Sequence, residues 1–287
     1  MPEAPAPEAL APHGAKREGP DLIVIPARFG STRLPGKPLI EIAGRTLLSR
    51  VIAVGRAAAI IAGNVEILVA TDDERIANHA RALDCEVVLT DVDITTGSGR
   101  ACAAATSRPS RPSIVVNLQG DAPFIPPATV TAVLGRLRTS KCAVATPVVH
   151  LDWASLDALR DHKRVAPFSG TTCTRAADGR AHWFSKTIIP AIRNEAALRA
   201  VGPMSPVYRH LGLYAYRLDA LERFERTPPT PYEQAEGLEQ LRFLEAGSDI
   251  LTIAVDPPRY AISGIDTRED VALAERLIAD LGDPWPA

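Results

Sequence analysis

A cationic loop punctuated by glycines follows the first apolar run of the chain. The run at 22–25 ends at Pro26, and the loop behind it holds Arg28, Gly30, Ser31, Arg33, Gly36 and Lys37. Glycine lets backbone N–H groups approach an anion closely, while Arg and Lys neutralise its charge. This composition directly after a strand predicts a polyphosphate site, in preference to an ordinary solvated basic loop.

Two aspartates from distant parts of the chain add a second chemistry. Asp121 follows the apolar run at 113–118, and Asp266 precedes the last predicted helix. A carboxylate at the carboxyl end of a strand projects into the ligand crevice of an open α/β sheet. Two of them could hold Mg²⁺, which takes few protein carboxylates and completes its shell with phosphates and water. Asp266 alone fits equally well as the N-cap of the helix that follows it.

Strands and helices alternate in the first half of the chain. Apolar runs predict strands at 22–25, 66–70, 86–89 and 113–118, with helices at 46–61, 74–83 and 100–106. Near-continuous apolar strands indicate parallel strands that are covered on both faces. We therefore expect an α/β, Rossmann-like fold with a mixed, mostly parallel sheet.

The second half of the chain changes character. We expect strands at 143–149, 171–175, 181–185, 211–216 and 250–255, and helices at 231–246 and 267–281. Turn residues such as those at 177–179 favour an antiparallel extension of the sheet. No internal repeat or linker divides the sequence. We expect one domain over 21–287, preceded by a disordered Pro/Ala-rich tail at 1–20.

The composition gives no sign of a nucleic-acid or membrane partner. The 287 residues carry a formal net charge of −2, and no apolar run is long enough to span a bilayer. The first twenty residues lack the hydrophobic core of a signal peptide. The four cysteines have no metal-ligand spacing, so we expect reduced core thiols and a cytoplasmic location.

Seven segments keep the order and spacing of a known family. They are IPARFGSTRLPGKPL (25–39), ATDDERI (70–76), VNLQGDAP (116–123), FSKTIIP (184–190), RHLGLYAYR (209–217), LEQLR (238–242) and GIDTREDV (264–271). Through them the chain resembles the CMP-Kdo synthetases (3-deoxy-manno-octulosonate cytidylyltransferases) from residue 21 almost to its end. The resemblance implies a nucleotidyltransferase fold, a cytoplasmic homodimer and dependence on Mg²⁺. It also implies transfer of CMP from CTP to a small acidic acceptor, with release of pyrophosphate.

The resemblance also assigns roles to individual residues. The catalytic set would be Arg28, Lys37, Asp121 and Asp266, with the two aspartates holding the metal. Contacts to CTP would come from Ala27, Arg28, Gly30, Ser31, Arg33, Lys37, Thr71, Asp72, Gly97, Ser98, Arg100 and Gln119. The acceptor would meet Gln119, His210, Tyr214, Glu236 and Gln240. Without the resemblance, His210 and Tyr214 fit polar core positions on a strand. Glu236 and Gln240, four residues apart, fit a surface pair on a helix.

The chain departs from the family around the nucleobase loop and the acceptor. The family's His-x-Ser-Gly-Thr-Asp/Glu-Arg reads Ile-Thr-Thr-Gly-Ser-Gly-Arg at 94–100, and its Gln-Gly-Asp-Glu-Pro reads Gln-Gly-Asp-Ala-Pro at 119–123. The lysine of a further family segment has no clear counterpart in 162–175. Fewer carboxylates near the pocket would suit a more anionic acceptor, because each removed like charge lowers the repulsion.

These departures lead to a specific hypothesis about the acceptor. We hypothesise transfer of CMP to a phosphonate, such as phosphonoformate, in natural-product biosynthesis. The alternative is synthesis of CMP-Kdo for lipopolysaccharide. A third interpretation, a non-catalytic nucleotide-binding regulator, conflicts with the intact set of Arg28, Lys37, Asp121 and Asp266.

Overall fold

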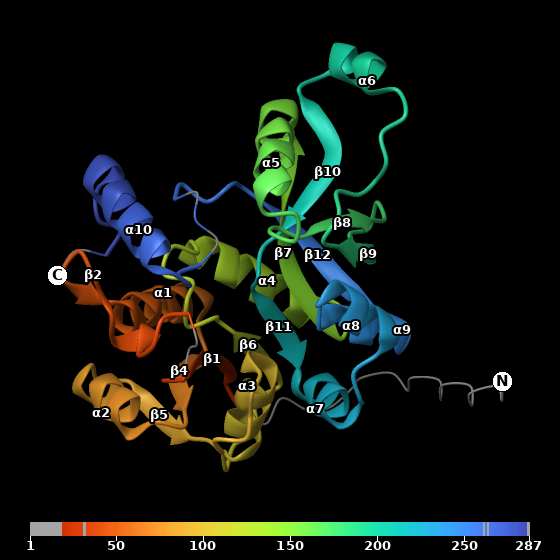
Figure 1. Ribbon diagram of the computed structural model, residues 1–287. Coiled ribbons are helices and arrows are strands. Elements are labelled where there is room, and N and C mark those ends of the chain that lie inside the picture. The colour runs from red at the N-terminus through yellow and green to blue at the C-terminus, as the bar shows by residue number, and fades with distance from the viewer. Residues whose placement is uncertain (1–18, 31–32, 261, 263, 286–287) are drawn as a thin grey trace.

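A single mixed sheet runs through the computed structural model, which describes residues 19–30, 33–260, 262 and 264–285. Most of the predicted tail, and Ser31 among the predicted CTP contacts, lie outside the described residues. Within the described residues the sheet has ten strands, in the order β5-β4-β1-β6-β11-β7-β10-β8-β9, with β12 beside β7 (Figure 1).

The first half supplies the parallel part of the sheet. Its strands are β1 (Asp21–Ala27), β4 (Val65–Thr71), β5 (Glu86–Leu89) and β6 (Ile114–Asn117). Its helices are α1 (Leu47–Ala62), α2 (Glu74–Ala82), α3 (Gly97–Thr106) and α4 (Pro127–Thr139). A 3₁₀ turn, η1 (Lys37–Leu39), and a short hairpin of β2 (Glu41–Ile42) and β3 (Arg45–Thr46) connect β1 to α1. All pairings among β1, β4, β5 and β6 are parallel, which confirms the Rossmann-like prediction.

The second half extends this sheet. Its strands are β7 (Val144–Asp152), β8 (Thr172–Arg175), β9 (Ala181–Ser185), β10 (Met204–His210), β11 (Tyr214–Arg217) and β12 (Ile250–Val255). Its helices are α5 (Trp153–Val165), α6 (Glu195–Val201), α7 (Leu218–Arg226), α8 (Pro231–Glu236), α9 (Gln240–Glu245) and α10 (Arg268–Leu281). The strand β12 is parallel to β7, whereas the other pairings of this half are antiparallel. The sheet is mixed as predicted, but parallel pairings predominate only in its first half.

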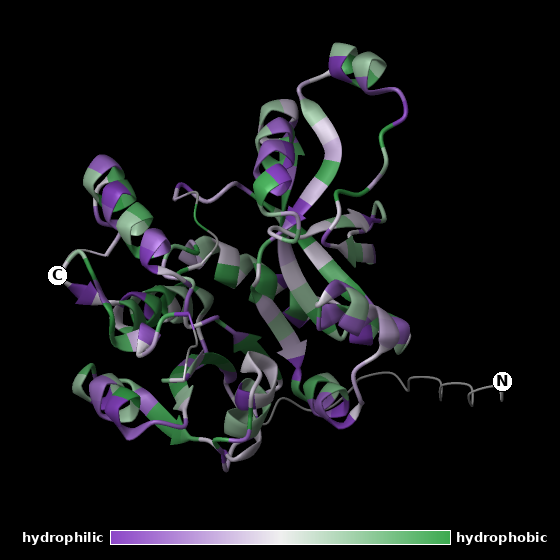
Figure 2. Ribbon diagram, in the orientation of Figure 1, coloured by the Kyte–Doolittle hydropathy of each residue, from purple (hydrophilic) through white to green (hydrophobic). Residues whose placement is uncertain are grey.

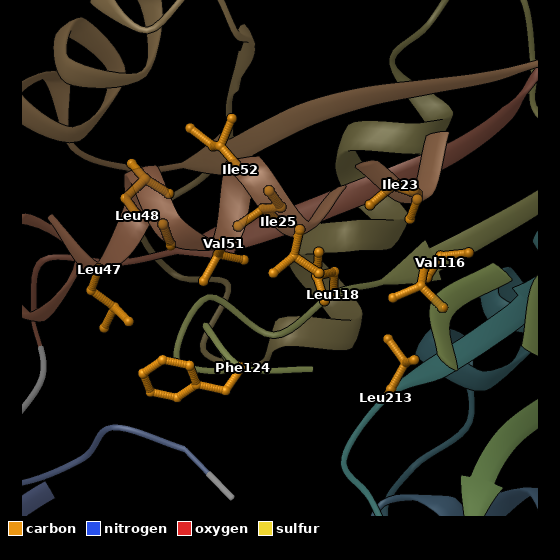
Figure 3. Close-up of a cluster of buried hydrophobic side chains, with 14 of the residues drawn as sticks. Ile23, Ile25, Leu47, Leu48, Val51, Ile52, Val116, Leu118, Phe124 and Leu213 are labelled. Carbon is orange, nitrogen blue, oxygen red and sulfur yellow. The ribbon is translucent and has the colours of Figure 1, made fainter. Parts of the chain in front are cut away.

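Strand β1 is buried on both faces, as its unbroken apolar sequence indicates. Ile23 and Ile25 pack with α1 and α4 on one face, whereas Leu22 and Val24 pack with α3 and α7 on the other. Figure 3 shows Ile25 beside Val51 of α1, within the first of these clusters. Figure 2 shows apolar positions along the central strands and polar ones on the outer sides of α2 and α10. The loop that follows β1 therefore starts from a fixed point in the core.

Two predicted elements of the second half are wrong in detail. The expected helix at 231–246 is two helices, because Gly237 takes a left-handed conformation with φ 62° and ends α8. The expected strand at 211–216 is the connection between β10 and β11 followed by the start of β11. The helices α4, α5, α6 and α7, and the strand β10, had no predicted counterpart.

The remaining global expectations concern membranes and thiols. Among the residues that the structure describes, no helix combines the length and apolarity that a membrane crossing requires. All four cysteines are free, and Cys85, Cys102 and Cys173 are buried. Burial raises the pKa of the Cys173 thiol to about 12, so that side chain is an inert core thiol.

Gly120 allows the loop after β6 to pass directly over the end of β1. A Cβ atom built at this position would overlap the backbone carbonyl oxygen of Pro26. We expect Gly120→Ala to displace the loop and to lower the free energy of unfolding by about 1–3 kcal/mol, a typical cost of overpacking. Urea unfolding measures the change.

A matched control is Gly135→Ala in α4, where an added Cβ atom meets nothing within 4 Å. We expect this change to raise the free energy of unfolding by about 0.5–1 kcal/mol, through helix propensity alone. Equal unfolding midpoints for Gly120→Ala and the unmodified protein would contradict the close approach of Gly120 to the backbone of Pro26.

Candidate active site

A cavity of about 330 Å³ lies where β1 and β6 end, within the usual size range of a ligand pocket. Nine residues from the predicted site line it: Ala27, Arg28, Arg33, Lys37, Gly97, Arg100, Gln119, Asp121 and Asp266. Sequence reasoning missed its other lining residues, Pro26, Pro38, Thr95, Thr96 and Gly120. Four of them directly adjoin predicted residues in the chain and Thr95 lies two residues before Gly97, so the motif boundaries were drawn too narrowly.

The ammonium group of Lys37 lies between the two predicted metal-binding carboxylates. Its Nζ donates to Asp121 Oδ2 at 2.9 Å and to Asp266 Oδ1 at 3.0 Å. Burial alone would lower the pKa of Lys37, but the two carboxylates outweigh burial and raise the pKa above its usual value. The guanidinium of Arg33 adds an ion pair with Asp266 Oδ2 at 3.1 Å. Lys37 is therefore charged, and both aspartates face one cation position.

The donor set at this position fits Mg²⁺. Oxygen atoms of Asp121 and Asp266 converge on one point, and both side chains are about one-third exposed, at 31% and 37%. Such a site leaves room for water and phosphate oxygens, which Mg²⁺ retains in its shell. No cluster of three or more His, Cys, Asp or Glu side chains suited to a metal occurs in the described part of the chain. Metal held here would consequently depend on ligand oxygens from the substrate.

A backbone hydrogen bond fixes the two aspartates relative to each other. The N–H of Ile265 donates to the carbonyl oxygen of Asp121 at 2.9 Å. The N-cap of α10 is Thr267, whose side chain accepts from the N–H of Asp270, while the Asp270 carboxylate accepts from the N–H of Asp266. The interpretation of Asp266 as the N-cap is therefore wrong. Its carboxylate is left to face the cavity.

Arg100 organises the loop that was expected to contact the nucleobase. Its guanidinium pairs with Asp72 at 3.0 Å and donates to the carbonyl oxygen of Ile94 at 2.8 Å and to the hydroxyl of Thr90. Arg100 is only 2% exposed. Arg100 and Asp72, which were both predicted to contact CTP, thus bind each other. Their observed interaction holds the 90–96 loop against the end of β4.

Ser98 faces carboxylates on other helices and does not line the cavity. Its hydroxyl donates to Glu239 Oε2 at 2.9 Å, and a Cβ atom added to Gly99 would lie 2.9 Å from Glu225 Oε2. Desolvation raises the pKa of Glu225, and the Ser98 hydroxyl opposes this shift. The Glu225 carboxylate of α7 thus lies beside Gly99, where the resemblance implies an acidic residue. Glu225 is 126 residues away in the chain, so the sequence around Gly99 carries no signal for it.

The predicted acceptor residues on β10 and β11 form a neutral polar corner. The rings of His210 and Tyr214 lie 5.3 Å apart, and Tyr214 pairs with Asn117 of β6, two residues before Gln119. The Thr146 hydroxyl donates to the carbonyl oxygen of Leu213 at 2.7 Å, so it accepts from His210 Nε2 at 2.8 Å. The second ring nitrogen of His210, Nδ1, then carries no proton and can accept a hydrogen bond from a ligand hydroxyl.

Burial, with a smaller contribution from the charge of Lys186, lowers the pKa of His210 to about 3. Burial also raises the pKa of Tyr214, so both rings are neutral at physiological pH. The corner therefore recognises a ligand through hydrogen bonds. The His210 and Tyr214 side chains themselves contribute no charge.

Glu236 and Gln240 lie on two different helices, α8 and α9, and not on one helix face as predicted. The Glu236 carboxylate accepts from the Ser185 hydroxyl and from the N–H of Lys186, each at 2.7 Å. Gln240 is 4% exposed, and its Nε2 has no hydrogen-bond partner among the described residues. A buried amide nitrogen without a partner is costly, and the role of Gln240 toward the acceptor stays a prediction. The signal for Ser185 and Lys186 was present in the FSKTIIP segment.

The structure leaves four predicted CTP contacts outside the lining of the cavity. Thr71 is fully buried, and its hydroxyl accepts from the N–H of Asp73. Gly30 is exposed, whereas Asp72 and Ser98 are engaged as described above. Their assignment as CTP contacts stays a prediction.

Comparisons with known proteins agree with this geometry. The family model described as cytidylyltransferase matches residues 22–250. A 3-deoxy-manno-octulosonate cytidylyltransferase of Maricaulis maris is 41% identical over 91% of this chain and 98% of that protein. A protein of the same name from Chelativorans sp. is 38% identical over 90% of this chain and 96% of its own length.

Solved structures give the same result. A CMP:2-keto-3-deoxy-manno-octonic acid synthetase complexed with CTP has a TM-score of 0.77 and 32% identity, covering 92% of this chain and 100% of that one. A cytidylyltransferase from Leptospira borgpetersenii, with a TM-score of 0.57 and 18% identity, shares the fold. The resemblance read from the seven segments is thereby confirmed.

The low pKa of His210 predicts a measurable acid sensitivity. Because folding holds the ring neutral, its contribution to stability is complete above the unfolded pKa near 6.5 and is lost as the pH falls towards 3. Between pH 4 and 6, His210→Asn should remove a slope of about 1.4 kcal/mol per pH unit from the free energy of unfolding. Urea unfolding at each pH measures it. An NMR titration of the folded protein with a His210 midpoint near 6.5 would refute the assignment.

Proposed function

This chain belongs to the cytidylyltransferase family, and we propose that the acid to which it transfers CMP is 3-deoxy-manno-octulosonate (Kdo) or a close ulosonic acid. As a CTP-dependent nucleotidyltransferase it joins the acceptor oxygen to the α-phosphorus of CTP and releases pyrophosphate. The observation that supports the proposal is the Asp121–Lys37–Asp266 cluster at the strand ends, together with the polar pair of His210 and Tyr214 on the strands beside β6.

The donor half of the reaction rests on fixed positive charge. Arg28, Arg33 and Lys37 line the cavity, where they would hold the triphosphate and offset its repulsion of an anionic acceptor. Mg²⁺ held by Asp121 and Asp266 would neutralise charge on the phosphates. The chain otherwise contributes positioning, because attack in line with the leaving pyrophosphate requires two anions to be held together.

The acceptor half suits a polyhydroxylated acid. His210 Nδ1 and the Glu236 carboxylate accept from hydroxyl groups, whereas Gln240 Nε2 donates. The Lys186 ammonium lies close enough to shift the pKa of His210, so a positive charge is present for the acid group of the acceptor. A sugar acid offers both kinds of partner, while phosphonoformate has no row of hydroxyls for this corner.

The structure weakens the argument that favoured a phosphonate. That argument rested on carboxylates lost from positions 99 and 122, yet Glu225 and Glu239 supply carboxylates beside Gly99. Negative charge near the nucleobase loop is therefore relocated and not removed. The relatives that match over nine-tenths of this chain are named as Kdo enzymes.

A panel of acids tests the acceptor. With CTP and Mg²⁺, we expect pyrophosphate release with Kdo at a rate at least about a hundredfold above that with phosphonoformate, which lacks the hydroxyls to be paired. The inactive control is Asp121→Asn. We expect this variant to keep its far-ultraviolet circular dichroism spectrum and to lose pyrophosphate release with every acid. Faster release with phosphonoformate than with Kdo would establish the phosphonate hypothesis. Tight CTP binding without release from any acid would leave only a nucleotide-binding regulator.

We also propose that the enzyme is a homodimer that uses the arm formed by α6 and the start of β10. Figure 1 shows α6 at one end of the molecule, away from the sheet's centre. The apolar residues Val201, Leu198 and Met204 are 87%, 43% and 43% exposed there. Arg199 pairs with Asp157 of α5 at 2.7 Å and so fixes α6 against the body. A rigid element with exposed apolar residues is suited to an interface.

The assembly is tested by mass. Light scattering should give twice the chain mass of 30.7 kDa, and the double variant Leu198→Asp/Val201→Asp should give a single chain mass, because charge is depleted from interface cores. Ile60→Asp is the control, since Ile60 is 83% exposed on α1. A monomeric parent protein would refute the proposal.

A further inference from the structure

A four-residue segment after α10, residues 282–285, passes over the loop that carries Asp121. We call it the strap. Trp285 Nε1 donates to the carbonyl oxygen of Pro123 at 3.2 Å. The next residue, Phe124, stacks on Tyr260 with ring centroids 4.8 Å apart and an interplanar angle of 15°. The strap is thus bonded two residues from a predicted metal-binding carboxylate.

The strap also contacts the segment that leads to Asp266. The Tyr260 hydroxyl donates to the carbonyl oxygen of Gly282 at 2.6 Å. Since the N–H of Ile265 donates to the carbonyl oxygen of Asp121, the two loops are joined to each other as well. Strap, Asp121 loop and Asp266 loop therefore form a closed set of contacts around the cation position.

A buried ion pair anchors the strap to the body of the protein. The Arg50 side chain is 0% exposed, and its two terminal nitrogens bind the Asp283 carboxylate at 2.8 and 3.0 Å. Burial would raise the pKa of Asp283, but the hydrogen bonds from Arg50 and from the N–H of Trp285 lower it overall. Arg50 also donates to the carbonyl oxygen of Ile42 at 2.6 Å. This bidentate pair fixes the strap in direction as well as in position.

Apolar packing holds one side of the strap, because Trp285 packs partly buried against the core cluster that contains Phe124 and Tyr260. A cavity of about 310 Å³ is also lined by Phe124, Tyr260 and Trp285. The hydrogen bonds and the ion pair therefore act together with this packing in ordering the strap.

We propose that the strap is a positioning element for the metal site, with Trp285 and Asp283 as positioning residues. It holds the Asp121 and Asp266 loops at the separation at which both carboxylates reach one cation. The inference rests on the proposed role of those aspartates and is independent of the acceptor. Residues outside a metal's own ligands commonly tune its affinity in this way.

The test removes the indole N–H donor of Trp285 and keeps an aromatic ring at that position. In Trp285→Phe, hydrogen exchange of the full chain without substrates should accelerate in both 119–126 and 264–267. The Mg²⁺ concentration for half-maximal pyrophosphate release should rise about tenfold, the low end for such outer contacts, with the KM for CTP little changed. Tyr260→Phe removes the second contact and should act in the same direction.

Trp153→Phe is the matched control, because Trp153 Nε1 donates to the carbonyl oxygen of Gly202 at 2.9 Å on the distant arm. We expect it to leave both loops and the Mg²⁺ requirement unchanged. Unchanged exchange in the two loops of Trp285→Phe would overturn the proposal. If the loops exchange faster while the Mg²⁺ requirement stays constant, the strap orders the loops without serving the metal site, which also overturns it. Exchange is measured without acceptor, so a wrong acceptor leaves this test intact.

Discussion

Two carboxylates that share one cation impose the main constraint on this structure. Asp121 and Asp266 come from segments far apart in the chain, with Lys37 lying 229 residues from Asp266. Like charges brought this close repel, and partial burial strengthens the repulsion. The Lys37 ammonium offsets this repulsion, and the two carboxylates in turn raise the pKa of that lysine. The loop after β1 must therefore place Lys37 accurately. The contacts of the neighbouring loops serve this requirement.

The sheet meets the requirement through order and close approach. Parallel β1 and β6 end side by side, so the cationic loop and Asp121 emerge at one edge of the sheet. Gly120 permits the contact with Pro26, and the Ile265–Asp121 hydrogen bond carries α10 to the same place. Each of these contacts is backbone to backbone or requires the absence of a side chain. The site's geometry is thus set by the fold before any of its charged side chains is placed.

The sequence allowed the donor half to be predicted because its signals are local. An apolar strand, a glycine-containing cationic loop and an aspartate after a strand are each contiguous patterns. The acceptor half was harder, since apolar periodicity continues through Gly237 and conceals the break between α8 and α9. The polar strand β10 lacks the alternation that marks strands. Glu225 lies beside Gly99 only in three dimensions, so no reading along the chain could have found that contact.

The two halves of the site differ in how they bind, and this difference bears on specificity. Arg28, Arg33 and Lys37 attract any anion, so they favour CTP and acidic acceptors alike and discriminate poorly among them. The side chains of His210, Tyr214 and Gln240 carry no charge. The free-energy cost of burying them is offset only when their hydrogen bonds are all made. An acceptor without matching hydroxyls leaves those groups unpaired. On the proposed function, the choice of the acid falls to these uncharged groups, while the charged loop serves the nucleotidyl transfer that is common to all acceptors.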